Sequence, residues 1–221
     1  IASCLVGSEM CIRDRYTRRN RAEYRKIAGY IARCVWQRQG NYMVFFPSYR
    51  LMEDVLQVYE EEFSVDWVRC VCQTPDMTEQ EREGFLEEFQ EREGTLVGFC
   101  VLGGIFSEGV DLTGESLIGA VIVGTGLPQI GSQREILKEY YDKKNHCGFD
   151  YAYRYPGMNK VLQAAGRVIR TKEDKGVILL LDDRFWDRDY QEIFPREWQD
   201  RTGCRLDTVE GAVETFWKRF T

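Results

Sequence analysis

The sequence predicts an α/β fold in which helices cover both faces of a parallel sheet. From about residue 21 onward, short apolar segments alternate with longer segments whose apolar residues recur at helical spacing. Several short segments are unbroken apolar runs, which are typical of strands buried on both faces. Strands that alternate with helices favour parallel connections. A chain of 221 residues can bury one good core, so we expect a single domain over residues 21–221.

Composition indicates a soluble globular protein. Apolar residues make up 43% of the chain and charged residues 30%, and no apolar run approaches the length of a membrane span. We therefore expect a cytoplasmic protein with no membrane partner. The 30 basic and 36 acidic residues give a net charge of -6. This balance disfavours a nucleic-acid binder held by a general positive field, but it allows a basic groove on one face.

The eight cysteines do not predict a metal site. They form no CxxC pair, and the closest two, Cys70 and Cys72, cannot supply a normal ligand set alone. His146 is the single histidine, so the chain has poor material for zinc. We expect scattered reduced thiols and no bound metal.

The N-terminal segment is unlike the rest of the chain. Residues 5–15, LVGSEMCIRDR, have no clear periodicity and resemble the conceptual translation of a transposon-end sequencing adapter. We therefore expect residues 1–20 to be a non-native or disordered segment of a truncated gene product. An ordinary N-terminal segment is the alternative, and a coding sequence that differs from the adapter would support it.

Strands and helices alternate in the first half of the domain. Apolar runs, or alternation in the case of 67–72, predict the strands, and apolar residues at helical spacing predict the helices. The expected elements are a helix over 21–39, a strand over 42–46, a helix that carries Leu51 to Phe63, a strand over 67–72, a helix that Thr78 and Glu81 begin with a capping box, and a strand over 95–102.

Ser48 and Tyr49 lie where the strand over 42–46 gives way to a helix. A small hydroxyl residue at such a junction can present its OH and nearby backbone N–H groups to a phosphate. The alternative for Ser48 is a purely structural role as the N-cap of the helix.

A glycine-rich acidic turn follows the strand over 95–102. It reads GGIFSEGVDL and includes Glu108, Gly109 and Asp111. In α/β sheets, ligands bind beyond the carboxyl ends of the strands, so this turn is a candidate binding loop. A role for Asp111 as the cap of the next turn stays open.

The second half continues the alternation. An insertion over 142–153 has aromatic residues that either stack on bases or pack against the domain. The other expected elements are a strand over 117–123, a turn-rich loop GTGLPQIG, a helix over 132–141, a helix from Pro156 to Arg170, a strand over 177–181 and a last helix over 208–220.

The helix that begins at Pro156 has a polar flank beside its apolar stripe. Gln163, Gly166, Arg167 and Arg170 recur at helical spacing, and no acid lies on this segment. Two guanidiniums one turn apart, with a glycine that leaves room for a ligand, suit phosphate oxygens. A basic helix end that complements its own dipole explains Arg170 but neither Arg167 nor Gln163.

Three motifs in order resemble one known family. QAAGRVIRT, followed by DKGVILLLDDRF, resembles motif VI of superfamily 2 helicases in the form found in the XPD/DinG family of ATP-dependent DNA helicases. FFPSY resembles motif IV of that family, and the glycine-rich acidic turn resembles motif V. The resemblance covers about residues 41–187. It implies a RecA-like P-loop NTPase-type fold and the second motor domain of a helicase.

The resemblance also implies roles for these residues. The candidate arginine fingers, for ATP bound on another motor domain, are Arg167 and Arg170. The implied nucleotide contacts or coupling residues are Gln163, Glu108, Gly109 and Asp111. The implied DNA contacts are Ser48 and Tyr49. The implied partners are single-stranded or forked DNA and the N-terminal motor domain of the same parent chain. The iron-sulfur cluster of many relatives belongs to that first domain and is not expected here.

The chain contains no GxxxxGK[ST] phosphate loop and no DEAH-type acid pair. In the family, those parts hold ATP and Mg²⁺ on the first motor domain. We therefore expect a helicase in the full-length parent and little ATP hydrolysis by this piece alone. A non-catalytic nucleic-acid or protein-binding module is the alternative, and the upstream gene sequence separates the two. A metabolic nucleotide-binding enzyme is disfavoured because no GxGxxG follows the first strand.

Overall fold

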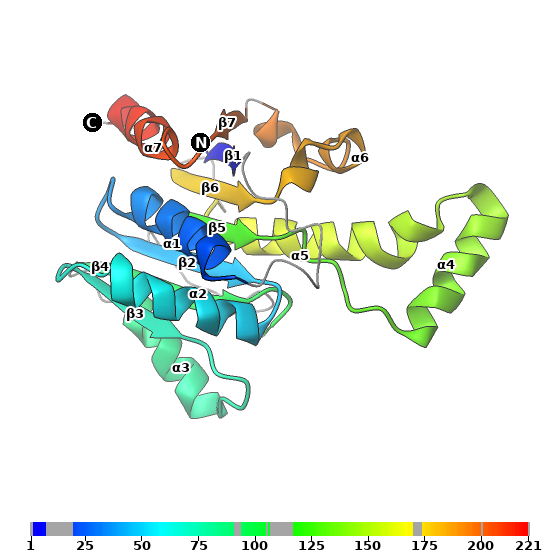
Figure 1. The fold of residues 1–221 in the computed structure, drawn as a ribbon, viewed down its shortest axis with the longest axis horizontal. Coiled ribbons are helices and arrows are strands. Elements are labelled where there is room, and N and C mark those ends of the chain that lie inside the picture. Colours follow the sequence, from blue (N-terminus) through cyan, green and yellow to red (C-terminus); the bar gives the residue numbers. More distant parts are fainter. Residues whose placement is uncertain are drawn as a thin grey trace.

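One parallel sheet organises the protein (Figure 1). The computed structural model describes residues 2–7, 20–90, 94–104, 106, 117–169, 174–199 and 201–220. Within these residues seven strands pair in the order β3-β4-β2-β5-β6-β1-β7, and every pairing is parallel. The strands are β1 (Ala2–Gly7), β2 (Asn41–Phe46), β3 (Val68–Cys72), β4 (Thr95–Val101), β5 (Gly119–Val123), β6 (Gly176–Leu181) and β7 (Thr202–Cys204). The predicted α/β class is confirmed.

Helices cover both faces of the sheet. The α-helices are α1 (Arg21–Val35), α2 (Tyr49–Glu62), α3 (Glu79–Glu87), α4 (Ser132–Asn145), α5 (Tyr155–Ala165), α6 (Arg188–Gln191) and α7 (Val209–Trp217). A π-helical turn, η2 (Asp150–Arg154), precedes α5. Short 3-10 helices are η1 (Glu88–Gln90), η3 (Asp183–Trp186), η4 (Arg196–Trp198) and η5 (Lys218–Phe220).

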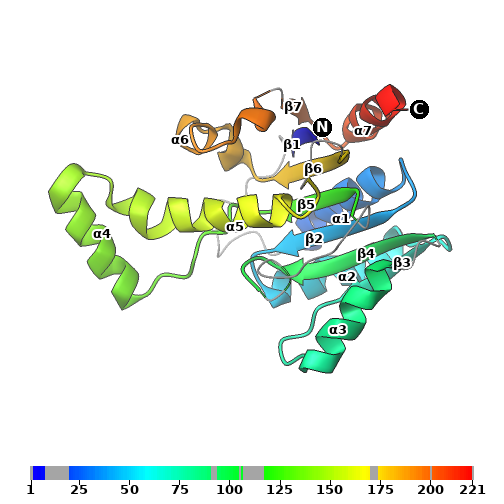
Figure 2. The same ribbon diagram turned by 180° about the vertical axis from the view of Figure 1, so that it is seen from behind.

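The two faces have separate apolar cores. Helices α1, α2 and α7 lie on the face seen in Figure 1, and α3 and α5 lie on the face seen in Figure 2. Within β2, Val44 belongs to the first core while Met43 and Phe45 belong to the second. Successive strand residues point to opposite faces, so a strand covered on both sides must be apolar throughout. This explains why the central strands are unbroken apolar runs.

The sequence located five of the strands well. Strands β2, β4, β5 and β6 lie where apolar runs predicted them, and β3 lies where alternating residues predicted a strand. The capping box that begins α3 is also confirmed, because Glu81 N–H donates to Thr78 Oγ1 over 3.3 Å while Thr78 N–H donates to Glu81 Oε2 over 2.7 Å.

Strands β1 and β7 were not predicted. The backbone of β1 pairs with β6 in the register Ala2↔Gly176, and β7 pairs with the other edge of β1. Of residues 1–20, for which we expected a non-native or disordered segment, residues 1 and 8–19 lie outside the described residues. Whether that segment is native, and where the domain begins, stay predictions.

Helix α5 runs along one face of the sheet, from the carboxyl ends of the strands toward their amino ends. At its first turn, Gly157 lies so close to the loop after β5 that a Cβ at Gly126 would be 2.7 Å from the Gly157 carbonyl oxygen. Just beyond its last turn, Val168 lies against Gly176, the first residue of β6. The helix therefore links the carboxyl ends of the strands to their amino ends.

A helical arm extends from the body of the domain. Figures 1 and 2 show α4 and η2 standing away from the sheet, with α5 leading back to it. We define the arm as residues 130–155. None of the fourteen residues of α4 is buried.

The contact between the loop after β5 and α5 predicts opposite effects of two glycine substitutions. Gly126 has a φ of 66° and no room for a methyl group, so Gly126→Ala should lower the free energy of unfolding by about 1–3 kcal/mol. Gly84 lies in α3 with open space around it, so Gly84→Ala should raise stability by about 0.5–1 kcal/mol. Urea unfolding of the 221-residue chain measures both. Equal shifts of the two midpoints would contradict this account.

Candidate nucleotide and nucleic-acid interface

The turn after β2 places Ser48 and Tyr49 at the carboxyl edge of the sheet. Ser48 is the N-cap of α2, and its Oγ accepts a hydrogen bond from the Leu51 N–H over 3.4 Å. The structural role that the sequence left open for Ser48 is therefore confirmed. An N-cap oxygen acts as an acceptor, so the hydroxyl hydrogen remains available to a ligand on the solvent side.

A buried glutamine after β3 holds Tyr49 in place. Gln73 is 2% exposed. Its Oε1 accepts from the Val101 N–H over 2.9 Å, and its Nε2 donates to the Tyr49 hydroxyl oxygen over 2.9 Å. Only the amide oxygen can accept from a backbone N–H, so the contact with Val101 fixes the orientation of the amide. The Tyr49 oxygen is consequently an acceptor in this bond.

Tyr49 keeps a neutral hydroxyl that can donate. Burial, followed by electrostatic interactions with Cys100 and Asp76, raises the pKa of the Tyr49 phenol. Because its oxygen already accepts from Gln73, its hydrogen is available to a different acceptor. A phosphate oxygen has the chemistry to receive that hydrogen bond.

The turn after β4 contacts both Gln73 and α5. Gly103 has a φ of 72°, and a Cβ there would lie 2.7 Å from Lys160 Cε. A Cβ at Gly104 would lie 3.0 Å from Gln73 Nε2. The glycines thus allow the turn to pass between a lysine of α5 and the buried amide. Lys160 and Gln73 were not singled out from the sequence, because neither belongs to a motif with a recognisable spacing.

The end of α5 differs from the prediction. The helix was expected to continue through Arg170, but it ends at Ala165. Arg167 N–H donates to Ala164 O over 3.3 Å and Val168 N–H to Ala165 O over 3.1 Å, which is the tighter i to i−3 pattern. Gly166 follows directly after the helix, and glycine weakens helix propagation there. The prediction that Arg167 projects from the helix is therefore wrong.

The predicted nucleotide contacts are described only in part. Gln163 is exposed on α5, and Arg167 is half-buried in the turn near the amino end of β6. The other four predicted nucleotide-facing residues, Arg170, Glu108, Gly109 and Asp111, lie outside the described residues. Their roles stay predictions. Tyr49 follows the carboxyl end of β2, whereas Arg167 lies near the amino end of β6.

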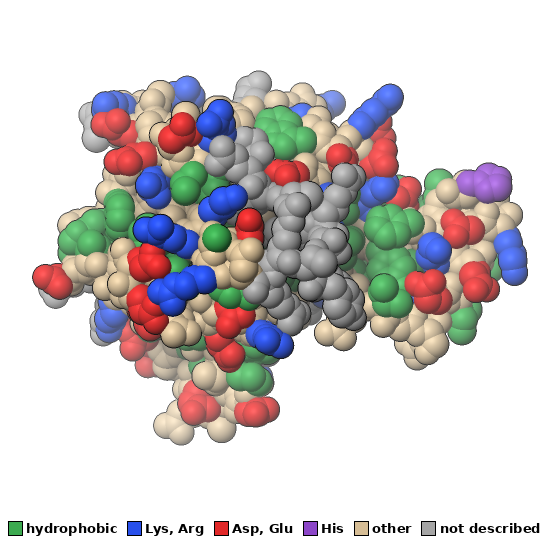
Figure 3. Space-filling model, viewed as in Figure 1, with side chains coloured by type: hydrophobic (Ala, Val, Ile, Leu, Met, Phe, Trp, Pro, Cys, Tyr) green, Lys and Arg blue, Asp and Glu red, His purple; other side chains and the backbone are tan. Residues whose placement is uncertain are grey.

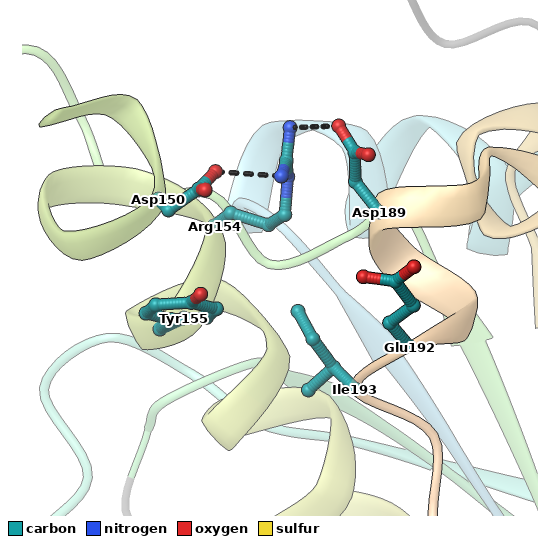
Figure 4. A pocket seen from close by; sticks show the side chains of 6 residues that line it. All are labelled: Asp150, Arg154, Tyr155, Asp189, Glu192 and Ile193. Carbon is teal, nitrogen blue, oxygen red and sulfur yellow. Dashed lines mark ion pairs between the residues drawn. The ribbon is translucent and has the colours of Figure 1, made fainter. Parts of the chain in front are cut away.

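A pocket of about 370 Å³ lies at the base of the arm (Figure 4). Arg154 donates to Asp150 over 2.6 Å and to Asp189 of α6 over 2.8 Å. Glu192 also lines the pocket. Three carboxylates around one paired guanidinium would repel a triphosphate, so the pocket does not suit a nucleotide. Its ion pairs join the arm to α6.

The side chains that the structure describes do not offer a metal site. Within those ranges, no three His, Cys, Asp or Glu side chains are grouped so that they could hold an ion. Burial raises the pKa of both Cys34 and Cys204 to about 12, with a smaller contribution from Cys204 at Cys34. Such thiols stay protonated at neutral pH and are poor ligands.

Comparison with known families identifies the domain. A family described as "Helicase C-terminal domain" matches residues 31–201, more than half of the chain. The chain belongs to this helicase family. Curated relatives agree: the regulator of telomere elongation helicase 1 homolog of Drosophila persimilis is 30% identical in an alignment 178 residues long that covers 74% of this chain and 17% of that protein. The ATP-dependent DNA helicase XPD of Sulfolobus acidocaldarius is 28% identical in an alignment 193 residues long that covers 82% of this chain and 31% of that protein.

Solved structures establish the RecA-like fold of this helicase domain. An XPD helicase structure superposes with a TM-score of 0.73 at 22% identity over 92% of this chain and 35% of that chain. The C-terminal domain of the DEAD-box protein Dbp5 superposes with a TM-score of 0.51 at 15% identity over 97% of each chain.

The chain spans less than a third of the length of the two curated relatives. In the described residues, no helix is long and apolar enough to cross a membrane.

The buried position of Gln73 predicts a stability loss on its replacement. Gln73→Leu leaves the Val101 N–H without its acceptor, so the free energy of unfolding should fall by about 1–3 kcal/mol. Gln57 is an exposed glutamine on α2, so Gln57→Leu is a matched control that should stay within about 0.5 kcal/mol of the unmodified chain. Urea unfolding distinguishes the two, and a Gln73→Leu midpoint equal to that of the control would contradict the assigned hydrogen bonds.

Proposed function

We propose that this domain is the second motor domain of an ATP-dependent DNA helicase and works with a first motor domain of the same parent chain. The observation that carries the proposal is the placement of α5 in a chain of the helicase C-terminal family. One end of this helix lies against the loop after β5, and its other end leads to Arg167, near the amino end of β6. Such a helix can connect a nucleotide site to a DNA site.

At the nucleotide end, Arg167 and Arg170 act as arginine fingers. Negative charge on the phosphoryl oxygens is stabilised by a positioned guanidinium in the transition state of phosphoryl transfer. ATP and Mg²⁺ are held mainly by the first motor domain, since this chain has no phosphate loop of its own. Gln163 and the acidic turn with Glu108, Gly109 and Asp111 complete the proposed nucleotide contacts.

At the DNA end, Ser48 and Tyr49 donate hydrogen bonds to the backbone of single-stranded or forked DNA. The support is their position at the carboxyl edge of β2 and the available hydrogen of the Tyr49 hydroxyl. Gln73 is a positioning residue here, because it sets the Tyr49 oxygen as an acceptor and leaves its hydrogen for the phosphate.

The two ends are linked through the turn after β4. Lys160 of α5 packs against Gly103, and the neighbouring Gly104 contacts Gln73. Closure of the two motor domains on ATP would displace α5 slightly, and these contacts would carry the displacement to the turn that holds Tyr49. Repeated closure and opening would then move the protein along DNA.

Loss of either finger predicts a large fall in turnover. In the full-length protein, Arg167→Ala or Arg170→Ala should reduce DNA-stimulated ATP hydrolysis by about 10³-fold or more, because known arginine fingers supply about 10³ to 10⁵ in rate. DNA affinity without nucleotide should be retained. Arg196→Ala, at an exposed arginine of η4, is the matched control and should leave turnover unchanged. Full turnover in both finger variants would exclude this role.

A further inference from the structure

The arm presents most of the exposed apolar surface in the described part of the chain. Nine large hydrophobic side chains are exposed there, and seven of them lie on the arm. Hydrophobic side chains are visible on the arm, beside the body of the domain, in Figure 3. The seven are Ile130, Ile136, Leu137, Tyr140, Phe149, Tyr151 and Tyr155. Exposed apolar residues that cluster in this way mark an interaction surface.

The arm is held together by its own polar contacts. Arg134 Nη1 donates to the Ala152 carbonyl over 2.8 Å, and the Gly148 N–H donates to Asp142 Oδ1 over 2.8 Å. Tyr153 is hydrogen-bonded to Glu135 through its hydroxyl. These bonds fix α4 against η2, so the exposed rings belong to a preformed surface.

Four tyrosines on this surface form a continuous series of ring contacts, which we call the tyrosine ladder. Tyr140 and Tyr141 have ring centroids 5.1 Å apart. Tyr141 and Tyr151 stack at 4.0 Å with an interplanar angle of 9°, and Tyr151 and Tyr155 are 5.3 Å apart. Tyr140 is 57% exposed, Tyr151 40% and Tyr155 39%. Three of the four rings are therefore exposed, and Tyr141 is half-buried.

Charge is unevenly placed around α4. At 100° per residue, Lys143 and Lys144 share a sector with Ile136 and Tyr140, whereas the three acids of the helix lie on a different side. Those acids are Glu135, Glu139 and Asp142. Lys144 Nζ lies 5.9 Å from the centroid of the Tyr140 ring. Exposed rings accompanied by lysines fit the bases and phosphates of a nucleic acid.

The loop that leads to the arm starts beside the proposed DNA-contacting turn. It leaves the carboxyl end of β5, which pairs with β2. A Cβ at Gly124 would lie 3.8 Å from Pro47 Cγ, in the residue before Ser48. This loop therefore leads from the proposed DNA-contacting turn to the arm.

We propose that the tyrosine ladder is a stacking platform for the unpaired bases of single-stranded DNA, with Lys143 and Lys144 near the phosphates. Base–aromatic stacking tolerates any sequence, because every base has a π-face. This suits a motor that moves along DNA regardless of sequence. The proposal rests on the proposed helicase function and extends its DNA-binding surface from the turn after β2 to the arm.

The test compares DNA with and without bases. Binding of the full-length protein to a single-stranded oligothymidylate and to an abasic oligomer of the same length is measured by fluorescence anisotropy. In the variant with both Tyr140→Leu and Tyr155→Leu, affinity for oligothymidylate should fall about tenfold or more, since each stacked base contributes about 1–3 kcal/mol. Affinity for the abasic oligomer should not change. Leucine keeps the surface apolar, so loss of ring stacking alone is tested.

Two controls sharpen the result. Tyr140→Trp with Tyr155→Trp keeps aromatic faces and should retain the wild-type preference for bases. Trp67→Leu removes another exposed ring, 39% exposed at the β3 edge, and should change neither affinity. Equal loss for both oligomers in the leucine variant, or no loss for either, would overturn the proposal, and the second outcome would favour a protein partner for the arm. If the wild-type protein bound neither oligomer, the proposed helicase function itself would fail.

Discussion

The close approach of two glycine backbones is the constraint on which the arrangement of this helicase domain depends. Gly126 follows β5 with a positive φ, and Gly157 lies in the first turn of α5. Neither position has room for a Cβ, because each would meet a backbone oxygen of the other segment at 2.6–2.7 Å. Cores are close-packed and transmit displacement, so a helix held this tightly moves with its anchor. At the other end, Val168 against Gly176 fixes the turn that holds Arg167.

Around this helix, polar contacts join elements that are distant in sequence. Gln73 after β3 holds both Tyr49 after β2 and the backbone of Val101 at the end of β4. A buried amide with both ends hydrogen-bonded is costly to disturb, which makes it a reliable positioning device. The loop that leads to the arm leaves the same end of the sheet as the turn with Ser48 and Tyr49, whereas Arg167, the described candidate finger, lies near the amino end of β6. In this account, α5 separates the two functions in space and couples them mechanically.

The sequence predicted the inner sheet because strands buried on both faces leave unbroken apolar runs such as the one in β6. It did not predict β7, which has three residues, TGC, and no apolar run of its own. The end of α5 was misplaced because the helical pattern of Arg167 and Arg170 continues past Gly166, whereas the backbone does not. Gln73 was missed because a buried glutamine and a loop glutamine look alike in sequence. The insertion at 142–153 was recognised as aromatic, but exposure of its rings depends on tertiary structure.

The central claim, that α5 couples nucleotide and DNA, is tested most directly by the DNA affinity of the full-length protein with and without a non-hydrolysable ATP analogue. Coupling between two sites is typically about 1–3 kcal/mol, so the two dissociation constants should differ by about fivefold or more in the wild-type protein. Gly157→Ala forces the first turn of α5 away from the Thr125 carbonyl and should bring the ratio of the two constants close to one, whereas Gly84→Ala should leave it unchanged. An unchanged ratio in Gly157→Ala, or a ratio of one in the wild-type protein, would contradict the account.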